Sequence, residues 1–475
     1  INADCVTNGG GDHHGAGGSV FLVAGSMSGA GNITAIYGYS PSTTSGGGGR
    51  ISLKLTGDGD FSGLTGSITT AKGKKSESGA GTIYYETKAQ AGGKGKLVLD
   101  NAGTSSEVVG RGADIFNDGE TYDFDEIVIR NGGRLTIHSG AVVSAKKITG
   151  HSYTYSYLEL KGGTLKLPAD YVLTNVRIRN RALDSRLLVG DHGDLILGGG
   201  VYLYTSTTET ELTVPGDLTV KRGAVATSDA TASTSDSGYG IRLQVLGDMT
   251  VESGGLLNAV GLGFNKDMES LGRGTSGSSC GGSHGGVVAG APVTRAYGSV
   301  KYPDTLGSGV LSRTERAGGR IRVKVGGTLT VNGMIDASGS VCNGCSLSTS
   351  GGSVWVTAGA LAGSGFICAG GGYLQTSTYP GAGGRVAVYL TGATSTFDGF
   401  YQAGGDITAC GARSQNVEKG RASKEFNKPV GAGGTVYLSD VSSGKPFGRL
   451  VVENRDSAVR TCGATIGPNV TDTDV

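Results

Sequence analysis

Short runs in which apolar and polar side chains alternate recur along the whole chain. Examples are ISLKL (51–55), KLVLD (96–100), EIVIR (126–130) and VAVYL (386–390), and each is rich in β-branched or aromatic residues. Alternation with a period of two places the apolar side chains on one face of an extended strand. No window of the sequence carries a sustained helical stripe with capping residues. The pattern therefore predicts an all-β chain.

A longer phrase recurs between residues 118 and 336. It has an apolar-Thr-apolar strand, a glycine corner and a second short strand, as in LTIHSGAVVSA (135–145), LTVKRGAVAT (218–227), MTVESGGLLNA (249–259) and LTVNGMIDA (329–337). One phrase cannot enclose a core, because each of its strands buries a single face. Stacked copies build a continuous interior with in-register ladders. The repeat predicts a parallel β-helix, that is, a β-solenoid built from internal repeats.

The last third of the chain repeats its first hundred residues. Residues 17–33 and 351–367 share nine identities in seventeen aligned positions, and GGGGRISLKLTG, ending at Gly57, matches GAGGRVAVYLTG, ending at Gly392. The extra residues between matched phrases fall in polar stretches, where stacked architectures place insertions. We therefore predict three parts: a first, partial Gly-rich repeat unit (1–117), central β-solenoid coils (118–336) and a second copy of the Gly-rich unit (337–475).

A string of β-sandwiches is the alternative fold, because short, evenly spaced strands fit it as well. Two-residue Asn-Gly hairpins flanked by alternating strands are scarce, however, and the LTV phrase repeats its residues as well as its pattern. These two observations favour the solenoid.

The phrases also carry a family resemblance. AYGSVKYPDTLGSG (296–309), AGGRIRVKVGGTLTVNGMIDASG (317–339) and the later GAGGRVAVYL are similar to the Gly-rich, GGGGRI-type repeat segments of very large secreted or cell-surface proteins. Such segments are interpreted as adhesin-like β-solenoids. The resemblance covers residues 284–440 well and residues 7–85 as a partial unit. It implies an extracellular structural or adhesive role and supplies no catalytic residues.

Composition and charge narrow the partners. The 475 residues include 90 Gly and carry a formal net charge of +1 with both signs interspersed, which offers no electrostatic footprint for nucleic acid. No apolar run approaches the ~20 residues that a membrane-spanning helix needs. Glycine frequency follows from the number of corners, where the backbone requires conformations that a Cβ disfavours. We expect neither nucleic acid nor a membrane span.

Cysteines recur in similar corner phrases. Cys342 and Cys345 lie in ASGSVCNGC, Cys368 in FICAG and Cys410 in ITACG. If these phrases are corners of successive coils, the four cysteines are disulfide candidates in an oxidising, extracellular setting. Free buried thiols and a metal site are the alternatives, although no second CxxC or suitably spaced His supports zinc.

No residues form a convincing catalytic or metal site, and we predict no cofactor. Asp191, His192 and Asp194 faintly resemble the acidic sites of pectate-lyase-like and polygalacturonase-like enzymes, but the close pair of carboxylates and its partner motifs are missing. A polar turn is the favoured interpretation, and His284 is likewise expected to be a loop residue. Asp12-His13-His14 adjoin in a Gly-rich loop, yet neighbouring side chains on a strand point to opposite faces.

Arginines and tyrosines supply the remaining candidates. Arg50, Arg320 and Arg385 each follow a glycine pair, as does Arg134, and we favour their bracing glycine-rich corners over their binding acidic glycans. An aromatic strip able to stack on sugars or on another subunit is predicted from the period-two residues Tyr153, Tyr155 and Tyr157. Candidates for N-glycosylation are the two sequon residues, Asn32 and Asn469.

The sequence thus predicts a non-enzymatic, extracellular β-solenoid that forms a rigid rod within a filament, appendage, sheath or adhesin. Self-association through the ends of the solenoid is the expected partnership, with glycans or other cell-surface proteins as further partners. The alternatives are a polysaccharide lyase or hydrolase on a β-helix and a carbohydrate-binding surface module.

Overall fold

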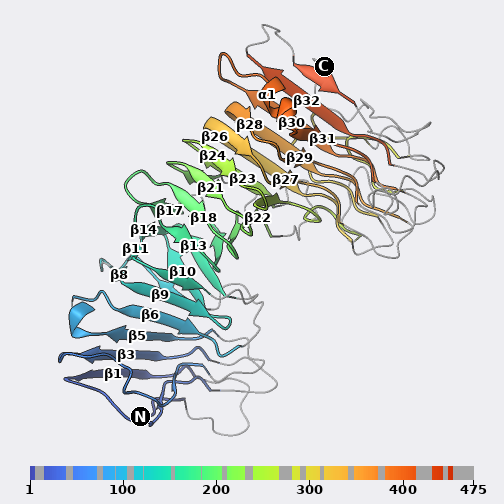
Figure 1. Cartoon of the computed structure of the whole chain (residues 1–475). Coiled ribbons are helices and arrows are strands. Elements are labelled where there is room, and N and C mark those ends of the chain that lie inside the picture. Colours follow the sequence, from blue (N-terminus) through green and yellow to red (C-terminus); the bar gives the residue numbers. More distant parts are fainter. Residues whose placement is uncertain are drawn as a thin grey trace. The chain divides into compact units, whose positions relative to one another are not determined.

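The computed structural model describes most of the chain. The described residues are 1–5, 15–38, 46–71, 79–90, 92–103, 112–120, 122–150, 156–182, 185–205, 211–229, 239–266, 281–288, 296–310, 315–340, 347–372, 380–412, 431–441 and 448–452. They are nearly all β, with strands joined into parallel sheets (Figure 1). Helix in the described residues is confined to a 3₁₀ turn, Lys88–Gln90, and one short helix, α1 (Asp398–Gln402).

The chain forms two compact units, Ile1–Leu203 (unit 1) and Tyr204–Val475 (unit 2). Strand β19 (Tyr202–Tyr204) contains the boundary. The central stretch predicted from the repeats, residues 118–336, is therefore shared between the two units.

Unit 1 contains three main sets of hydrogen-bonded strands. The first set is β1 (Ser19–Ala24), β3 (Arg50–Leu55), β5 (Thr82–Glu86), β6 (Lys96–Asp100), β9 (Glu126–Arg130) and β12 (Ile148–Gly150). The second is β7 (Ala113–Ile115), β10 (Arg134–His138), β13 (Tyr157–Lys161) and β16 (Arg177–Asn180). The third is β8 (Tyr122–Phe124), β11 (Val142–Ala145), β14 (Thr164–Leu167) and β17 (Arg186–Val189). Two short parallel pairs complete it: β2 (Ile33–Thr34) with β4 (Ile68–Thr69), and β15 (Val172–Leu173) with β18 (Leu195–Leu197).

Unit 2 has a similar organisation, in which β26 and β28 are the long strands with 12 and 10 residues. One path of neighbours is β21 (Leu218–Val220), β24 (Met249–Val251), β26 (Arg320–Val331), β28 (Ser353–Ala362), β30 (Arg385–Leu390), β32 (Thr435–Asp440) and β33 (Arg449–Val451). Strand β26 also pairs with β23 (Ile241–Val245), which pairs with β20 (Leu212–Val214). A second path is β22 (Val225–Thr227), β25 (Leu256–Asn258), β27 (Met334–Asp336), β29 (Phe366–Cys368) and β31 (Asp406–Thr408).

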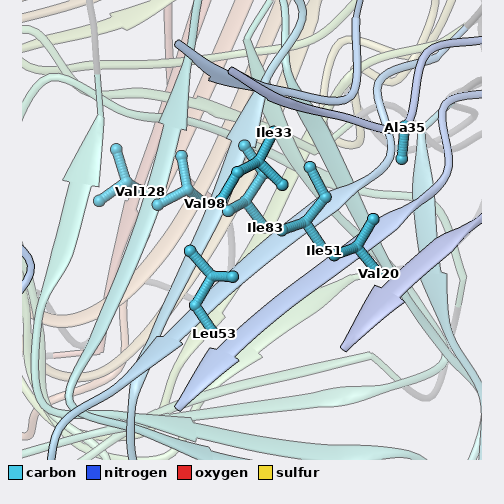
Figure 2. Close-up of a cluster of buried hydrophobic side chains, with 8 residues drawn as sticks. All are labelled: Val20, Ile33, Ala35, Ile51, Leu53, Ile83, Val98 and Val128. Carbon is cyan, nitrogen blue, oxygen red and sulfur yellow. The ribbon is translucent and has the colours of Figure 1, made fainter. Parts of the chain in front are cut away.

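Alternation explains which side of each strand is buried. In β3, Ile51, Leu53 and Leu55 are at most 2% exposed, whereas the intervening side chains are partly exposed. The parallel register places Val20 opposite Ile51 and Ile51 opposite Ile83. Figure 2 shows these side chains in one cluster with Ile33, and each such contact removes apolar surface from water.

Two strand pairs among the described residues run antiparallel, and they occupy matching positions in the two units. Strand β6 returns against β5, and β33 returns against β32. The pairs β1–β3, β3–β5, β26–β28, β28–β30 and β30–β32 are parallel, for which the chain must make a crossover between partners. The predicted all-β class is confirmed, and the sheets are parallel.

Candidate functional site: one glycine-rich face, covered in unit 2 and open in unit 1

A segment without regular structure lies across the large sheet of unit 2. Its described parts are residues 281–288 and 296–310, which we call the strap. The strap precedes β26 in the chain, yet it bonds to the later strands β28 and β30 and to the turns before them. Nearly all of it is buried, with Tyr302 the exposed member at 53%. The strap therefore belongs to the interior packing of unit 2.

Arginines on the sheet hold backbone groups of the strap. Arg385, which is fully buried, donates from Nε to the Tyr297 carbonyl (2.8 Å) and from Nη1 to the Thr435 hydroxyl (3.0 Å). Arg320 donates to the Asp304 carbonyl at 3.0 Å, and Asp304 also pairs with Arg242. A guanidinium has several donors in a fixed plane, which suits it to such a brace.

His284 is a second anchor of the strap. Its Nδ1 lies 2.9 Å from the Gly351 carbonyl oxygen and its Nε2 lies 2.8 Å from Thr305 Oγ1, so both ring nitrogens are engaged. Complete burial, reinforced by the positive charge of Arg385, lowers the pKa of His284 from 6.5 to about 3. The imidazole is consequently neutral at physiological pH and serves as a hydrogen-bonding group.

Aromatic side chains of the sheet pack against the outer part of the strap. The Tyr302 ring stacks parallel to the Tyr389 ring with centroids 6.0 Å apart, and lies 5.4 Å from the Trp355 ring. The Tyr389 hydroxyl donates to the Lys301 carbonyl at 2.7 Å. Val300 packs against Ala387 and Tyr437 on the sheet. Hydrogen bonds fix the position of the strap here, and apolar contact excludes water from them.

The corresponding strands of unit 1 carry the same columns of residues. In unit 2 the parallel register aligns Ser353, Arg385 and Thr435, and we call the side of the sheet that bears them the covered face. In unit 1 the register aligns the identical residue types, Ser19 with Arg50 and Arg50 with Thr82; we call this the open face.

The strand that pairs antiparallel with the sheet, β6 in unit 1 and β33 in unit 2, is duplicated as well. Tyr84 lies opposite Leu97 in unit 1, and Tyr437 lies opposite Leu450 in unit 2. The Tyr84 hydroxyl accepts a hydrogen bond from the Gly95 amide at 2.8 Å, and the Tyr437 hydroxyl accepts one from the Gly448 amide at 3.0 Å. The two faces therefore share the column of Ser, Arg and Thr and the tyrosine that contacts the returning strand.

Exposure distinguishes the two faces. Ser353, Arg385 and Thr435 are fully buried, whereas Ser19 and Arg50 are exposed and Thr82 is partly exposed. Phe21, at the position of Trp355, is 71% exposed.

A hollow of about 860 Å³ lies beside the open face. Its lining includes the glycine-rich turns and first strand residues, 47–50 and 79–82, together with Tyr84. The other side of the hollow is formed by β7, β8 and the start of β10. The face that the strap covers in unit 2 is therefore also formed in unit 1, where it is exposed.

Titratable groups stand around this hollow. His138 Nε2 lies 2.7 Å from Asp114 Oδ1, and the His138 ring stacks on Phe116, which is 57% exposed. A hydrogen bond to Asp118 raises the pKa of Tyr122 to about 12, so its phenol stays protonated.

Tyr84, on the open face, has its pKa raised to about 12 as well, by burial and by its hydrogen bond to Glu86. Each phenol donates its single O–H to a neighbouring carboxylate, Tyr84 to Glu86 and Tyr122 to Asp118.

Comparison with known proteins identifies no relative of this chain. No family model matches it, and neither curated proteins nor solved structures show a significant similarity to it. Within the described residues, no helix is long and apolar enough to cross a membrane. In the same residues, no group of three or more His, Cys, Asp or Glu is arranged to hold a metal ion.

The disulfide candidates are only partly described. Cys342 and Cys345 lie outside the described residues. The register places Cys368 opposite Thr408, so Cys410, two residues further along, is offset from it, and no disulfide joins the two. Burial and the neighbouring Asp336 raise the pKa of the Cys368 thiol, which disfavours the reactive thiolate. Disulfide formation involving Cys342 or Cys345 stays a prediction.

Of the three residues in the predicted tyrosine strip, the structure likewise describes only one. Tyr153 and Tyr155 lie outside the described residues, whereas Tyr157 is 5% exposed in β13. The Arg179 guanidinium lies 3.8 Å from the centroid of the Tyr157 ring, and Arg134 lies 5.2 Å from it. Tyr157 is therefore an interior residue that arginines cover, which differs from the exposed position we expected of it.

Asn32 is exposed, which leaves it accessible as a glycosylation candidate, and its Oδ1 accepts from the Ser67 amide at 3.1 Å. Asn469 lies outside the described residues, as do the predicted metal fragment residues Asp12, His13 and His14.

Arg320 and Arg385 do hold backbone carbonyl groups, but these belong to Asp304 and Tyr297 of the strap and not to glycine-rich corners, and Arg50 is exposed. Asp191 and His192 lie exposed in a turn, as expected. His284 does lie outside the strands, but it is fully buried and anchors the strap, which the sequence analysis did not foresee.

Proposed function

We propose that this chain is an extracellular structural repeat protein whose units are β-solenoids, and that it self-associates into a filament, appendage, sheath or adhesin. The observation that carries the proposal is the spacing and register of the long strands in unit 2. Arg320, Ser353 and Arg385 lie side by side in parallel strands, yet are separated by 33 and 32 residues. This regular return to the same column supports a solenoid, because stacked repeats place equivalent residues in register.

Backbone hydrogen bonding supports a mechanical role. Between β26 and β28 the register includes nine residue pairs, and β28 continues to β30 and β30 to β32. Such ladders cannot open one bond at a time without exposing buried polar groups. The strap adds bonds that run across the ladder, which oppose sliding of one strand past the next.

The ends of the sheets support self-association. Strand β1 stands at one end of its sheet and β33 at the end of another. An edge strand presents backbone donors and acceptors to any strand of matching length. Phe21 and Val23 are exposed in β1 at 71% and 50%, which adds apolar surface to this edge.

Electron microscopy of the purified chain under non-reducing conditions tests the proposal. Regular filaments that grow with protein concentration are the expected result. Dispersed single particles at every concentration would contradict the assembly role. Repeating the experiment with Phe21→Ser and Val23→Ser indicates whether the exposed β1 edge contributes, and a matched double substitution of the exposed Thr56 and Ser62 to Ala is the control.

A further inference from the structure

The covered face shows what the open face is built to accept. The strap reaches the sheet of unit 2 at a defined set of positions: the Gly351 and Gly383 carbonyls, the Ser353 and Arg385 side chains, and the rings of Trp355 and Tyr437. Their counterparts by sequence and by strand register in unit 1 are Gly17, Gly48, Ser19, Arg50, Phe21 and Tyr84. The polar side chains are identical, and an aromatic ring is kept at both aromatic positions.

The hollow coincides with the place where the glycine turn of the strap would dock. In unit 2, the Gly285 amide donates to the Gly383 carbonyl at 3.0 Å, and Val288 packs against Ala382 and Ala432. The counterparts of these two alanines are Gly47 and Gly79, and both line the hollow of unit 1. The same docking position is therefore present in unit 1, with additional room where the alanine methyl groups would be.

Glycines in the strap allow its backbone to approach the sheet closely at this position. A Cβ at Gly285 would collide with the Gly384 carbonyl, and a Cβ at Gly286 would collide with the Gly433 carbonyl. Close approach of two backbones needs glycine on the approaching segment. The sheet side of the contact in unit 1 is equally rich in glycine, with Gly47, Gly48 and Gly49 in sequence.

We propose that the open face of unit 1 is a docking site for a strap-type segment supplied by another polypeptide. The segment that fits is glycine-rich like residues 281–310, with a His-Gly-Gly turn for the hollow and a backbone carbonyl for Arg50. An aromatic ring at the position of Tyr302 would then lie against Phe21. The proposal goes beyond the structural role above, since the pairing does not depend on whether filaments form.

Two differences between the faces set the expected affinity. Ala387, against which Val300 packs, is replaced in unit 1 by Ser52. Tyr389, which donates to the Lys301 carbonyl, is replaced in unit 1 by Lys54, which is paired with Glu86 at 2.6 Å. A docked segment thus gains the Arg50, Ser19 and aromatic contacts and loses one tyrosine contact and one apolar contact. Supply in trans also carries an association cost that the covalently linked strap does not bear. We therefore expect micromolar rather than nanomolar binding by the isolated segment.

The test uses the full chain and a fluorescent synthetic peptide with the sequence of residues 281–310. Fluorescence anisotropy is expected to show saturable binding with one peptide per chain, and a peptide of scrambled order is expected not to bind. Arg50→Ala and Phe21→Ser should each weaken binding at least tenfold. Gly285→Ala in the peptide should have a similar effect, because the turn could no longer approach the sheet. Circular dichroism checks that the exposed substitutions leave the fold unchanged.

Three results would overturn the proposal. The first is the absence of saturable binding at millimolar peptide. The second is binding that Arg50→Ala leaves unaltered, since the peptide would then occupy another surface or displace the resident strap. The third is occupation of the hollow by an acidic oligosaccharide such as trigalacturonate while the peptide is inert, which would make the hollow a glycan site. Each result is independent of the electron microscopy, so the two proposals can fail separately.

Discussion

The two copies of the glycine-rich face have the same strands, the same register and the same central column of Ser, Arg and Thr, but opposite exposure. In unit 2, Arg385 is fully buried because the strap covers it; in unit 1, Arg50 is exposed. The residues of a face therefore do not determine its burial, because a distant segment of the chain decides it. The predictions below perturb one copy at a time, so that the other serves as its reference.

Acidification below pH 6.5 is expected to have the largest effect, and to act on the covered face first, because the carboxylates of the open face titrate only below their ordinary pKa values of 3.8 to 4.5. The pKa of His284 is about 3 in the folded protein and about 6.5 in an unfolded chain, so below pH 6.5 the unfolded state binds the additional proton. Stability from this residue is complete above pH 6.5 and falls by about 1.4 kcal/mol per pH unit as the pH drops toward 3. Hydrogen exchange of the strap amides between pH 7 and 4.5, corrected for intrinsic rates, measures this loss.

His284→Gln is the control for this prediction, because glutamine can donate and accept without titrating. Its strap should start less stable and show little further loss over the same pH range. An equal pH dependence in the variant would assign the effect to other groups.

The second largest difference between the two faces is expected when each of the two equivalent arginines is replaced by alanine. Arg385→Ala removes a buried side chain and leaves the Tyr297 carbonyl without this donor, which we expect to destabilise unit 2 by about 3 kcal/mol. Arg50→Ala removes an exposed side chain and should change stability by less than about 0.5 kcal/mol. Urea unfolding of both variants provides the comparison, and similar losses would show that the faces are not differently covered.

Substitution of the strap glycine should have a somewhat smaller effect. Gly285→Ala places a methyl group against the Gly384 carbonyl, so the turn must lift from the sheet at a cost of about 2 kcal/mol. The expected readout is faster exchange of the Gly285 and Tyr297 amides with unchanged exchange in β3. Gly47→Ala is the matched control, because a Cβ there meets open space and its counterpart in unit 2 is Ala382. Slowed or unaltered strap exchange in Gly285→Ala would contradict the close approach.

The outer hydrogen bond of the strap should contribute least. Tyr389→Phe removes the donor to the Lys301 carbonyl while keeping the ring that stacks on Tyr302, with an expected loss of about 1 kcal/mol. Thermal unfolding of unit 2 should shift slightly downward. No shift would contradict the account that apolar contact excludes water from this hydrogen bond.

Strand identity was predictable from the sequence because it depends on local alternation. ISLKL became β3, and the LTV phrase of residues 218–220 became β21, with the apolar positions buried in both. The duplication also predicted paired strands, since Ser19 and Ser353 occupy equivalent places in β1 and β28. Alternation and sequence repeats can be recognised from the order of the residues alone, so neither requires knowledge of the fold.

Whether each face is covered could not be predicted from such local patterns. His284 and Asp304 look like loop residues, and their anchoring depends on contacts such as that between His284 and Gly351, 67 positions apart. The repeated arginine after a glycine pair did indicate bracing. The nearby differences, such as Lys54 for Tyr389 and Gly47 for Ala382, do not reveal which segment covers the second copy. Residues 281–286 (GGSHGG) resemble residues 10–15 (GGDHHG), so the sequence relates the start of the strap to the first copy without showing that it is buried.

Chemical labelling of the two equivalent arginines tests the central claim most directly. Phenylglyoxal modifies accessible guanidinium groups, and mass spectrometry of the briefly treated native chain at low concentration reports Arg50 and Arg385 in one experiment. The account predicts rapid modification of Arg50 and none of Arg385 until the strap is released by urea or acid. Equal modification of both arginines, or preferential modification of Arg385, would contradict it.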